Sequence, residues 1–277
     1  MQEASTTKTQ ISAGRLRVGT SGYSYPEWND AGFYPPGTPA KEMLALYAKH
    51  FSITELNYTW YQMPKAAALE RMLPKVPSGF GFAAKLTRTM THEIDPHGWR
   101  GQVAQFREGI APLVQAGRLT ALLAQLPAAF QRTEENRRYL ALLLDALNGL
   151  PVAVEFRHRS WAEERVFAEL QKRRVPLVAV DVPDLPYLFP SLDVVTNPDL
   201  FYLRFHGRNA KGWRSGDMQK QFDYLYTSAE LQPWSQEKIP RMAAQARDGI
   251  IFFNNHVRGQ APRNAKMLAE QLGVQSP

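Results

Sequence analysis

The chain has 277 residues, of which 44% are hydrophobic and 21% are charged, and its formal net charge is +7. These proportions exclude a globally disordered chain, and the absence of cysteine excludes disulfides, thiolate metal sites and cysteine nucleophiles. The positive charge favours anionic partners, either an anionic small molecule or nucleic acid.

Residues 1–14 are polar and contain no apolar stretch of the kind found in signal peptides. We therefore expect a flexible N-terminal tail over residues 1–14, followed by one domain over residues 15–277. The apolar runs farther along, such as Ile250–Phe253, are too short to cross a bilayer. Together with the absence of cysteine, these features predict a cytoplasmic protein without membrane contact. No pattern predicts a particular oligomeric state.

Short apolar runs rich in β-branched and aromatic residues recur along the whole chain and predict β-strands. They are Leu16–Thr20, Ile53–Asn57, Gly79–Leu86, Leu119–Leu126, Val152–Phe156, Leu177–Asp181, Leu200–His206 and Ile250–Asn255. Several runs are apolar at consecutive positions, which is typical of parallel strands covered on both faces.

Helical patterns lie between most of these runs. They predict helices over Pro39–Phe51, Lys65–Leu73, Gln102–Ala116, Thr133–Asn148, Trp161–Arg174, Gln236–Asp248 and Pro262–Leu272. The alternation of strands and helices, with no linker inside, predicts a single (β/α)8 TIM-type barrel. The main alternative is an open sheet in two lobes, but the segment GTSGYS after the first strand is neither a dinucleotide-binding fingerprint nor a P-loop.

In such a barrel the functional groups gather at the carboxyl ends of the strands. Each predicted strand from the second to the eighth ends in a polar residue after an apolar run. The predicted catalytic residues, suited to acid and base roles, are Glu155, Asp181, His206 and His256. The predicted substrate-binding residues at these ends are Glu55, Lys85, His92, Gln125, Arg157, His158, Arg204, Asn254 and Asn255.

Aromatic side chains lie in the same predicted loops and could stack on a base or a sugar ring. Tyr23, Trp28, Tyr61 and Trp161 complete the predicted substrate-binding set. Alternation along a strand places Arg204 and His206 on one face, so that both point into the barrel if either does.

Several of these residues also have a plausible structural role. Glu155 could form a structural ion pair, and Asp181 could belong to a turn or cap a helix. His206 could be a core histidine beside a tight turn, and Asn255 could cap the last helix.

Seven segments together resemble the YecE-like family, known as domain of unknown function 72. In chain order they are VGTSGYSYPEW, FSITELNYTWYQMP, FGFAAKLTRTMTH, LLAQLPAAF, VAVEFRHRSW, LFYLRFHGRN and IIFFNNHVRGQAPRNA. The resemblance covers residues 15–272 and implies a TIM-type barrel, but it implies no particular reaction. A likeness of fold to divalent-metal barrels such as the apurinic endonucleases is an analogy only. Ala128 and Ala129 depart from the Pro-Ser pair that the family leads us to expect.

The first functional hypothesis is a phosphoester-directed hydrolase or a binder of a phosphate ligand. Lys85, Arg157, Arg204 and Arg208 would hold the anion, because guanidinium groups suit phosphate oxygens. Glu155 or Asp181 would act as the base and His206 or His256 as the acid.

No cofactor is predicted, although a divalent metal would find suitable ligands in Glu55, Glu155, Asp181, His206 and His256. Against a metal, the sequence lacks a compact ligand pair such as H-E-x-x-H, and the nearby cations would repel the ion. A glycoside hydrolase is one alternative, since it needs two carboxylates. A non-catalytic module that binds nucleic acid or a protein is the other.

Overall fold

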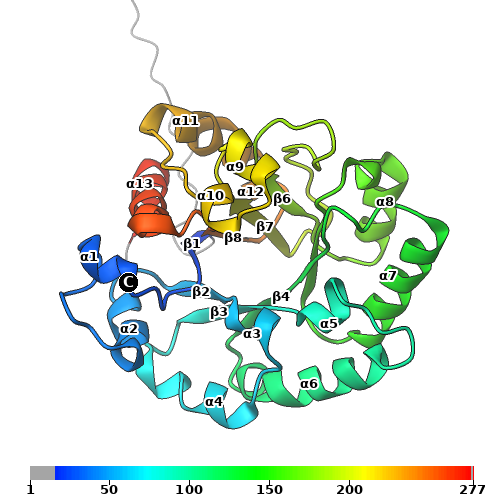
Figure 1. Ribbon diagram of the computed structural model, residues 1–277, viewed down its shortest axis with the longest axis horizontal. Helices are drawn as coiled ribbons and strands as arrows, with labels where there is room; N and C mark the ends of the chain where they lie inside the picture. The colour runs from blue at the N-terminus through cyan, green and yellow to red at the C-terminus, as the bar shows by residue number, and fades with distance from the viewer. Residues whose placement is uncertain (1–15, 276) are drawn as a thin grey trace, which may run out of the picture.

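The computed structural model describes residues 16–275 and 277, and the tail predicted over residues 1–14 lies outside them. Eight parallel strands form one nearly closed barrel surrounded by helices (Figure 1). The strands are β1 (Leu16–Ser21), β2 (Ile53–Leu56), β3 (Gly81–Lys85), β4 (Leu119–Gln125), β5 (Val152–Glu155), β6 (Val178–Asp181), β7 (Leu200–Phe205) and β8 (Asp248–Phe253). The predicted single (β/α)8 barrel and all eight predicted strands are confirmed, with shifts of up to two residues at their ends.

The strands follow the order β5-β4-β3-β2-β1-β8-β7-β6 around the barrel. The circle closes between β5 and β6 through one bridge, Val154 to Leu177, and a hydrogen bond of 2.9 Å from the Val154 amide to the Pro176 carbonyl. The strand register also places polar strand ends at the same level along the barrel axis. Ser21 lies beside Glu55, and Gln125 lies beside Glu155.

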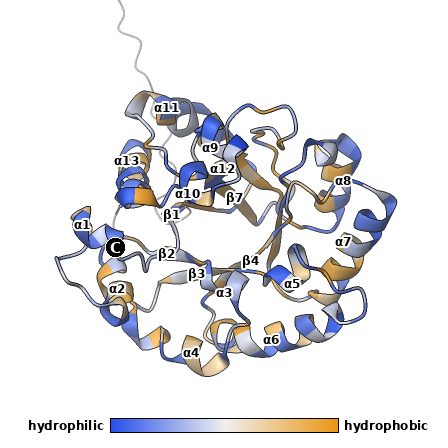
Figure 2. Ribbon diagram, in the orientation of Figure 1, coloured by the Kyte–Doolittle hydropathy of each residue, from blue (hydrophilic) through white to orange (hydrophobic). Residues whose placement is uncertain are grey.

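An outer ring of helices covers the barrel. It consists of α2 (Ala40–Tyr47), α4 (Ala66–Glu70), α6 (Trp99–Gln115), α7 (Glu134–Ala146), α8 (Glu164–Lys172), α11 (Ser228–Pro233), α12 (Ile239–Ala243) and α13 (Gln260–Leu272). In Figure 2 helices such as α6 and α13 carry both hydrophilic and hydrophobic residues. In α6 the buried side chains Val103, Phe106, Ile110 and Leu113 recur at helical spacing, so one stripe faces the barrel. No helix in the described part of the chain has the length and apolarity to span a membrane.

Shorter helices lie in the loops that follow the strands. They are α1 (Glu27–Asp30), α3 (Tyr58–Tyr61), α5 (Arg88–Thr91), α9 (Ala210–Ser215) and α10 (Met218–Gln221), with 3-10 turns at Leu73–Lys75, Arg159–Trp161 and Val257–Gly259. The sequence did not predict these short helices, because they have too few residues to develop a hydrophobic period.

The helix predicted over Gln236–Asp248 is divided. The chain forms α11, then a π-helical turn over Trp234–Lys238, then α12, which ends at Ala243. Pro233 and Pro240 lie in this stretch, and a proline within a helix has no N–H to donate and crowds the preceding turn. The π turn accommodates this break in the hydrogen-bond ladder.

Gly19 provides a test of how closely β1 and β2 approach. A Cβ atom at this position would lie 2.3 Å from the Ile53 carbonyl oxygen, which belongs to the backbone and cannot rotate away. We expect Gly19→Ala to lower the free energy of unfolding by about 1–3 kcal/mol, measured by urea denaturation. The control is Gly79→Ala at a position with open space around the added Cβ, where a change below about 0.5 kcal/mol is expected. Equal effects of the two substitutions would contradict the close approach.

Candidate functional site

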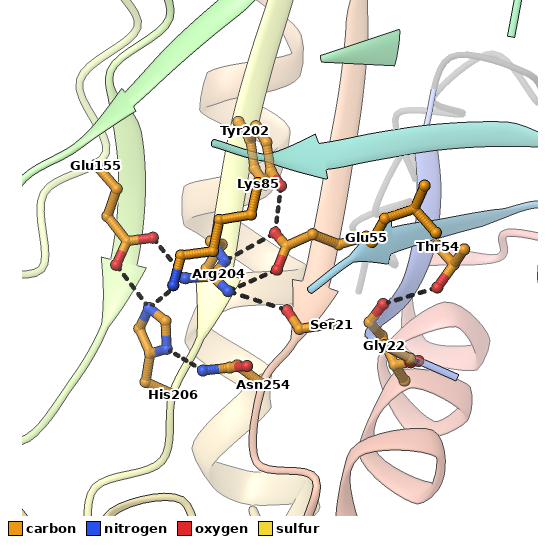
Figure 3. Close-up of polar contacts among 12 residues, drawn as sticks. Ser21, Gly22, Thr54, Glu55, Lys85, Glu155, Tyr202, Arg204, His206 and Asn254 are labelled. Carbon is orange, nitrogen blue, oxygen red and sulfur yellow. Dashed lines mark hydrogen bonds and ion pairs between the residues drawn. The ribbon is translucent and has the colours of Figure 1, made fainter. Parts of the chain in front are cut away.

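A buried arginine lies at the centre of the polar strand ends (Figure 3). Arg204 of β7 donates from Nε and Nη2 to the two carboxylate oxygens of Glu55, at 3.0 and 2.6 Å. Its Nη1 donates to Glu155 Oε2 at 2.6 Å, and its Nη2 also reaches Ser21 Oγ at 3.2 Å. The side chain is 1% exposed, and both glutamates are fully buried. Arg204 therefore joins β7 to β1, β2 and β5 across the barrel.

Two further groups complete the pairing of the carboxylates. Tyr202, two residues before Arg204 on the same strand, donates its hydroxyl to Glu55 Oε2. Arg157, just after β5, places Nε 2.5 Å from Glu155 Oε1 in an ion pair. Burial alone would raise the pKa of Glu155, but the charges of Arg157 and Arg204 hold it well below its usual range. Glu155 is therefore an ionised structural partner and a weak base.

His206 extends this cluster on the other side of Glu155. His206 Nδ1 lies 3.1 Å from Asn254 Nδ2, and its Nε2 lies 3.2 Å from Glu155 Oε1 and 3.3 Å from Arg157 Nη2. Burial, followed by the charge of Arg157, lowers the pKa of His206 to about 3. The imidazole is therefore neutral and fully enclosed.

A cavity of about 830 Å³ opens above the cluster, at the carboxyl ends of the strands. Aromatic side chains form much of its wall: Tyr23, Tyr25, Tyr58, Trp60, Tyr61, Tyr187, Trp213 and Phe222. Cations and amides form another part of the wall: Lys85, Arg157, Arg204, Asn57, Gln125, Gln219, Gln221 and Asn254. This volume and this mixture are typical of a small-molecule site.

Lys85, the last residue of β3, differs from the other cations of the cavity. In the described part of the chain its amine has no hydrogen-bond or carboxylate partner, and Nζ lies 5.0 Å from the centre of the Trp60 ring. Burial and the charge of Arg204 lower the pKa of Lys85 to about 7. At neutral pH a large fraction of this amine is therefore unprotonated.

Trp60 links Lys85 to a histidine on the cavity wall. Its indole Nε1 donates to His92 Nδ1 at 3.3 Å, while its face lies under the amine of Lys85. Burial and the charge of Lys85 lower the pKa of His92 to about 4. His92 is thus a neutral polar group beside the free amine.

The structure brings most of the predicted site residues together. Tyr23, Glu55, Tyr61, Lys85, His92, Gln125, Arg157, Arg204, Asn254 and His256 line the cavity. Glu155 and His206 lie directly beneath it as partners of Arg204 and Arg157. The remaining five, Trp28, His158, Trp161, Asp181 and Asn255, do not line it.

Asp181 points away from the barrel interior, contrary to the predicted catalytic role. It pairs in register with Phe205, the neighbour of the inward-facing Arg204, so its side chain enters the layer between strands and helices. There it accepts four hydrogen bonds, from Tyr226, Trp234 and two nitrogens of Arg208, at 2.7–2.8 Å. Arg208, predicted to hold an anion, is occupied by the same contact.

The other displaced residues make structural contacts. Trp161 stacks on Phe156 with ring centroids 4.5 Å apart, in the layer outside the strands. Asn255 donates to the Tyr224 carbonyl and to Asn264 of α13, at 2.7 and 2.9 Å.

Trp28 and His158 form hydrogen bonds that hold loop segments in place. Trp28 is fully buried and donates to the His256 carbonyl at 2.8 Å. His158 accepts from the Ser160 amide at 3.1 Å and so caps a 3-10 turn. The His256 ring lies parallel to that of Tyr25 with centroids 4.7 Å apart, and burial lowers the pKa of His256.

The five predicted metal ligands are not gathered at one point, although His206 Nε2 lies 3.2 Å from Glu155 Oε1. Glu55 and Glu155 lie on opposite sides of Arg204, Asp181 is on another face, and His256 lies beside Glu27. Within residues 16–275 and residue 277, no three histidine, aspartate or glutamate side chains are arranged to hold a metal ion. We therefore derive no step through a metal.

Sequence reasoning missed several lining residues and one partner of the cluster. Met218 and Phe222 come from the loop after β7 and were not predicted from the sequence. Tyr202 was read as part of an apolar strand. Its position two residues before Arg204 is the signal that could have placed it inside the barrel.

The Arg204 cluster predicts a large effect on stability. Removing the guanidinium leaves two buried carboxylates without their main partner, so Arg204→Met should lower the free energy of unfolding by about 3–5 kcal/mol. The control is Arg138→Met, since Arg138 is 74% exposed in an i,i+4 pair with Glu134, and it should cost at most about 1 kcal/mol. Urea denaturation measures both, and equal losses would contradict the buried role.

The neutral state of His206 makes stability depend on pH. In the unfolded chain this histidine has its ordinary pKa of 6.5, whereas in the folded chain its pKa is about 3. Stability therefore falls as the pH falls between these values, by up to about 1.4 kcal/mol per pH unit for one such group. His92 and His256 act in the same direction. We expect His206→Gln to flatten this slope in urea denaturation series, and the exposed control His97→Gln to retain it. An unchanged slope in His206→Gln would contradict the assignment.

Nearly the whole chain is similar to known proteins. The family described as "Protein of unknown function DUF72" matches residues 17–277. UPF0759 protein YunF of Bacillus subtilis (strain 168) is 28% identical over 263 residues, 90% of this chain and 93% of that protein. UPF0759 protein YecE of Escherichia coli (strain K12) is 29% identical over 175 residues, 60% of this chain and 59% of that protein.

Solved structures are similar over the same length. A DUF72 family protein from Thermotoga maritima has a TM-score of 0.84 at 34% identity, covering 93% of this chain and 99% of that one. A DUF72 family protein from Enterococcus faecalis also has a TM-score of 0.84, at 28% identity, covering 95% and 97%. Because the family match runs from β1 through α13 and includes every strand that contributes to the Arg204 cluster, the chain belongs to the DUF72 family.

Proposed function

We propose that the barrel mouth binds a small phosphorylated organic molecule. Lys85 and Arg157 would face the phosphate group, and the aromatic wall would contact the organic part. The observation that carries the proposal is the unpaired amine of Lys85 in the cavity, since Arg157 and Arg204 are already joined to carboxylates. A buried or half-buried cation without a partner is costly, and an anionic ligand would supply one.

Arg157, which follows β5 and lies two strands along the barrel from Lys85, supports the same assignment. Its guanidinium carbon lies 5.2 Å from the centre of the Trp213 ring while Nε is paired with Glu155. A guanidinium stacked in this way is held in one orientation, and Arg157 lines the cavity in which the anion would bind.

Binding is better supported than phosphoester hydrolysis. Glu155 and His206 are enclosed by their partners, and Asp181 accepts hydrogen bonds on another face. A general base must reach the proton it removes, within hydrogen-bond distance or through one water. We therefore assign these residues positioning roles and propose no hydrolytic step.

The alternative functions receive less support. A glycoside hydrolase needs two carboxyl groups free to act on one glycosidic bond, whereas Glu55 and Glu155 share the guanidinium of Arg204. A nucleic-acid module would use an extended basic surface. The concave cavity of about 830 Å³ instead suits a small molecule.

Isothermal titration calorimetry with phenyl phosphate tests this proposal. We expect Lys85→Met to weaken binding roughly ten- to hundredfold, the loss of one charge-assisted hydrogen bond. Lys85→Arg keeps the positive charge and should bind more tightly than Lys85→Met. The control is Lys65→Met, at an exposed position outside the cavity. Binding that is unaffected by Lys85→Met, or absent in the wild type, would contradict the proposal.

A further inference from the structure

We propose that Lys85 is a carbonyl-reactive lysine, whose amine condenses with the aldehyde or ketone group of an anionic ligand to form an imine in the barrel mouth. The inference rests on the proposed function and narrows its substrate class to small phosphorylated carbonyl compounds. It assigns Lys85 a catalytic role that anion binding alone does not require.

The geometry exposes the nitrogen of Lys85 to the cavity. The residue ends β3 and lines the cavity, and Ala83, which shares its face of the strand, is small and fully buried. Nζ lies 5.0 Å from the Trp60 ring centre, and no described oxygen accepts a hydrogen bond from it. The amine therefore contacts the face of Trp60 in the wall of the cavity but is not held by a hydrogen bond or an ion pair within the described residues.

The charges around Lys85 come from several elements and do not cancel at its amine. Glu55 of β2 and Glu155 of β5 are each joined to Arg204 of β7, and Arg157 adds a second cation beyond Glu155. Within the cluster, two carboxylates therefore face two guanidinium groups, so a protonated Lys85 would be an additional positive charge without its own counterion. His92, on the wall beside Trp60, is neutral and offers no negative charge.

These surroundings keep the amine reactive. Burial and the charge of Arg204 lower the pKa of Lys85 to about 7. A lysine desolvated beside another cation is a recognised form of activated amine nucleophile. At pH 7 it has roughly a thousandfold more free amine than a lysine at its ordinary pKa.

The step balances without an added oxidant or reductant. The lone pair of Nζ attacks the carbonyl carbon and forms the C–N bond, and one N–H proton passes to the carbonyl oxygen, which becomes a hydroxyl group. The second N–H proton leaves with that hydroxyl group. Loss of that hydroxyl as water breaks the C–O bond and leaves the imine. The overall change is amine plus carbonyl to imine plus water. When protonated, the imine keeps the positive charge at Lys85, so the anion binding of the proposed function persists after condensation.

Reductive trapping of the full chain tests the inference. Pyridoxal 5′-phosphate, which carries both an aldehyde and a phosphate group, is added at one equivalent, reduced with sodium borohydride, and located by peptide mass spectrometry. We expect Lys85 to be labelled at least about tenfold faster than exposed lysines such as Lys65, as expected for an activated amine. The trapping rate should rise with pH with a midpoint near the pKa of about 7. Lys85→Arg should lose this label, whereas Lys65→Arg should keep it.

The outcomes separate the two proposals. Labelling spread evenly over exposed lysines, or absent from Lys85, would overturn the imine while leaving a Lys85-dependent binding of phenyl phosphate intact. Equal rates at Lys85 for pyridoxal 5′-phosphate and for pyridoxal, which lacks the phosphate, would support the imine and count against the phosphate site. Because the wild-type protein gives the primary readout, the test holds even if a Lys85 variant fails to fold.

Discussion

The site depends on one buried guanidinium held between two carboxylates. Arg204 bonds Glu55 on one side and Glu155 on the other, so strands distant in sequence share one charged contact inside the barrel. Burial alone would lower the pKa of Arg204, but the two glutamates raise it above the usual value, so the guanidinium stays charged. Its mutual attraction with the glutamates offsets their desolvation only while every partner is present, which makes the cluster intolerant of losing any member.

This pairing divides the barrel mouth into two levels with different chemistry. The lower level contains Glu155, Arg204 and His206, whose donors and acceptors are directed at one another. The upper level is the cavity, where aromatic faces and amides surround Lys85. Because the lower level is ionised and enclosed, it supplies a fixed field, and the group that can respond to a ligand is the lysine above it. Positioning by buried partners of this kind is how a site is held rigid for binding or reaction.

The sequence predicts the barrel and much of the mouth because both depend on local patterns. Eight apolar runs specify the strands, and polar residues at their ends specify which edge carries function. Ion pairs between residues far apart in the sequence, such as Glu55 with Arg204, determine which cationic side chain has no carboxylate partner. Strand periodicity contains no information about these pairs. The direction of Asp181 likewise follows from its register with Phe205. A polar residue at a strand end faces the barrel interior only if it lies in register with inward-facing residues of the adjacent strands.

The contrast between Arg204 and Lys85 supports the role proposed for the lysine. Arg204 stabilises the fold through its ion pairs with Glu55 and Glu155, and its removal would leave these two buried carboxylates without their main countercharge. Lys85 has no such partner in the described residues, and its desolvation beside Arg204 opposes folding. An apolar side chain at the end of β3 would fill the same space against Trp60 without that opposition. A residue that breaks a local rule of stability without a compensating contact is expected at a functional site. The unbalanced amine is therefore the strongest physical indication of where this barrel acts.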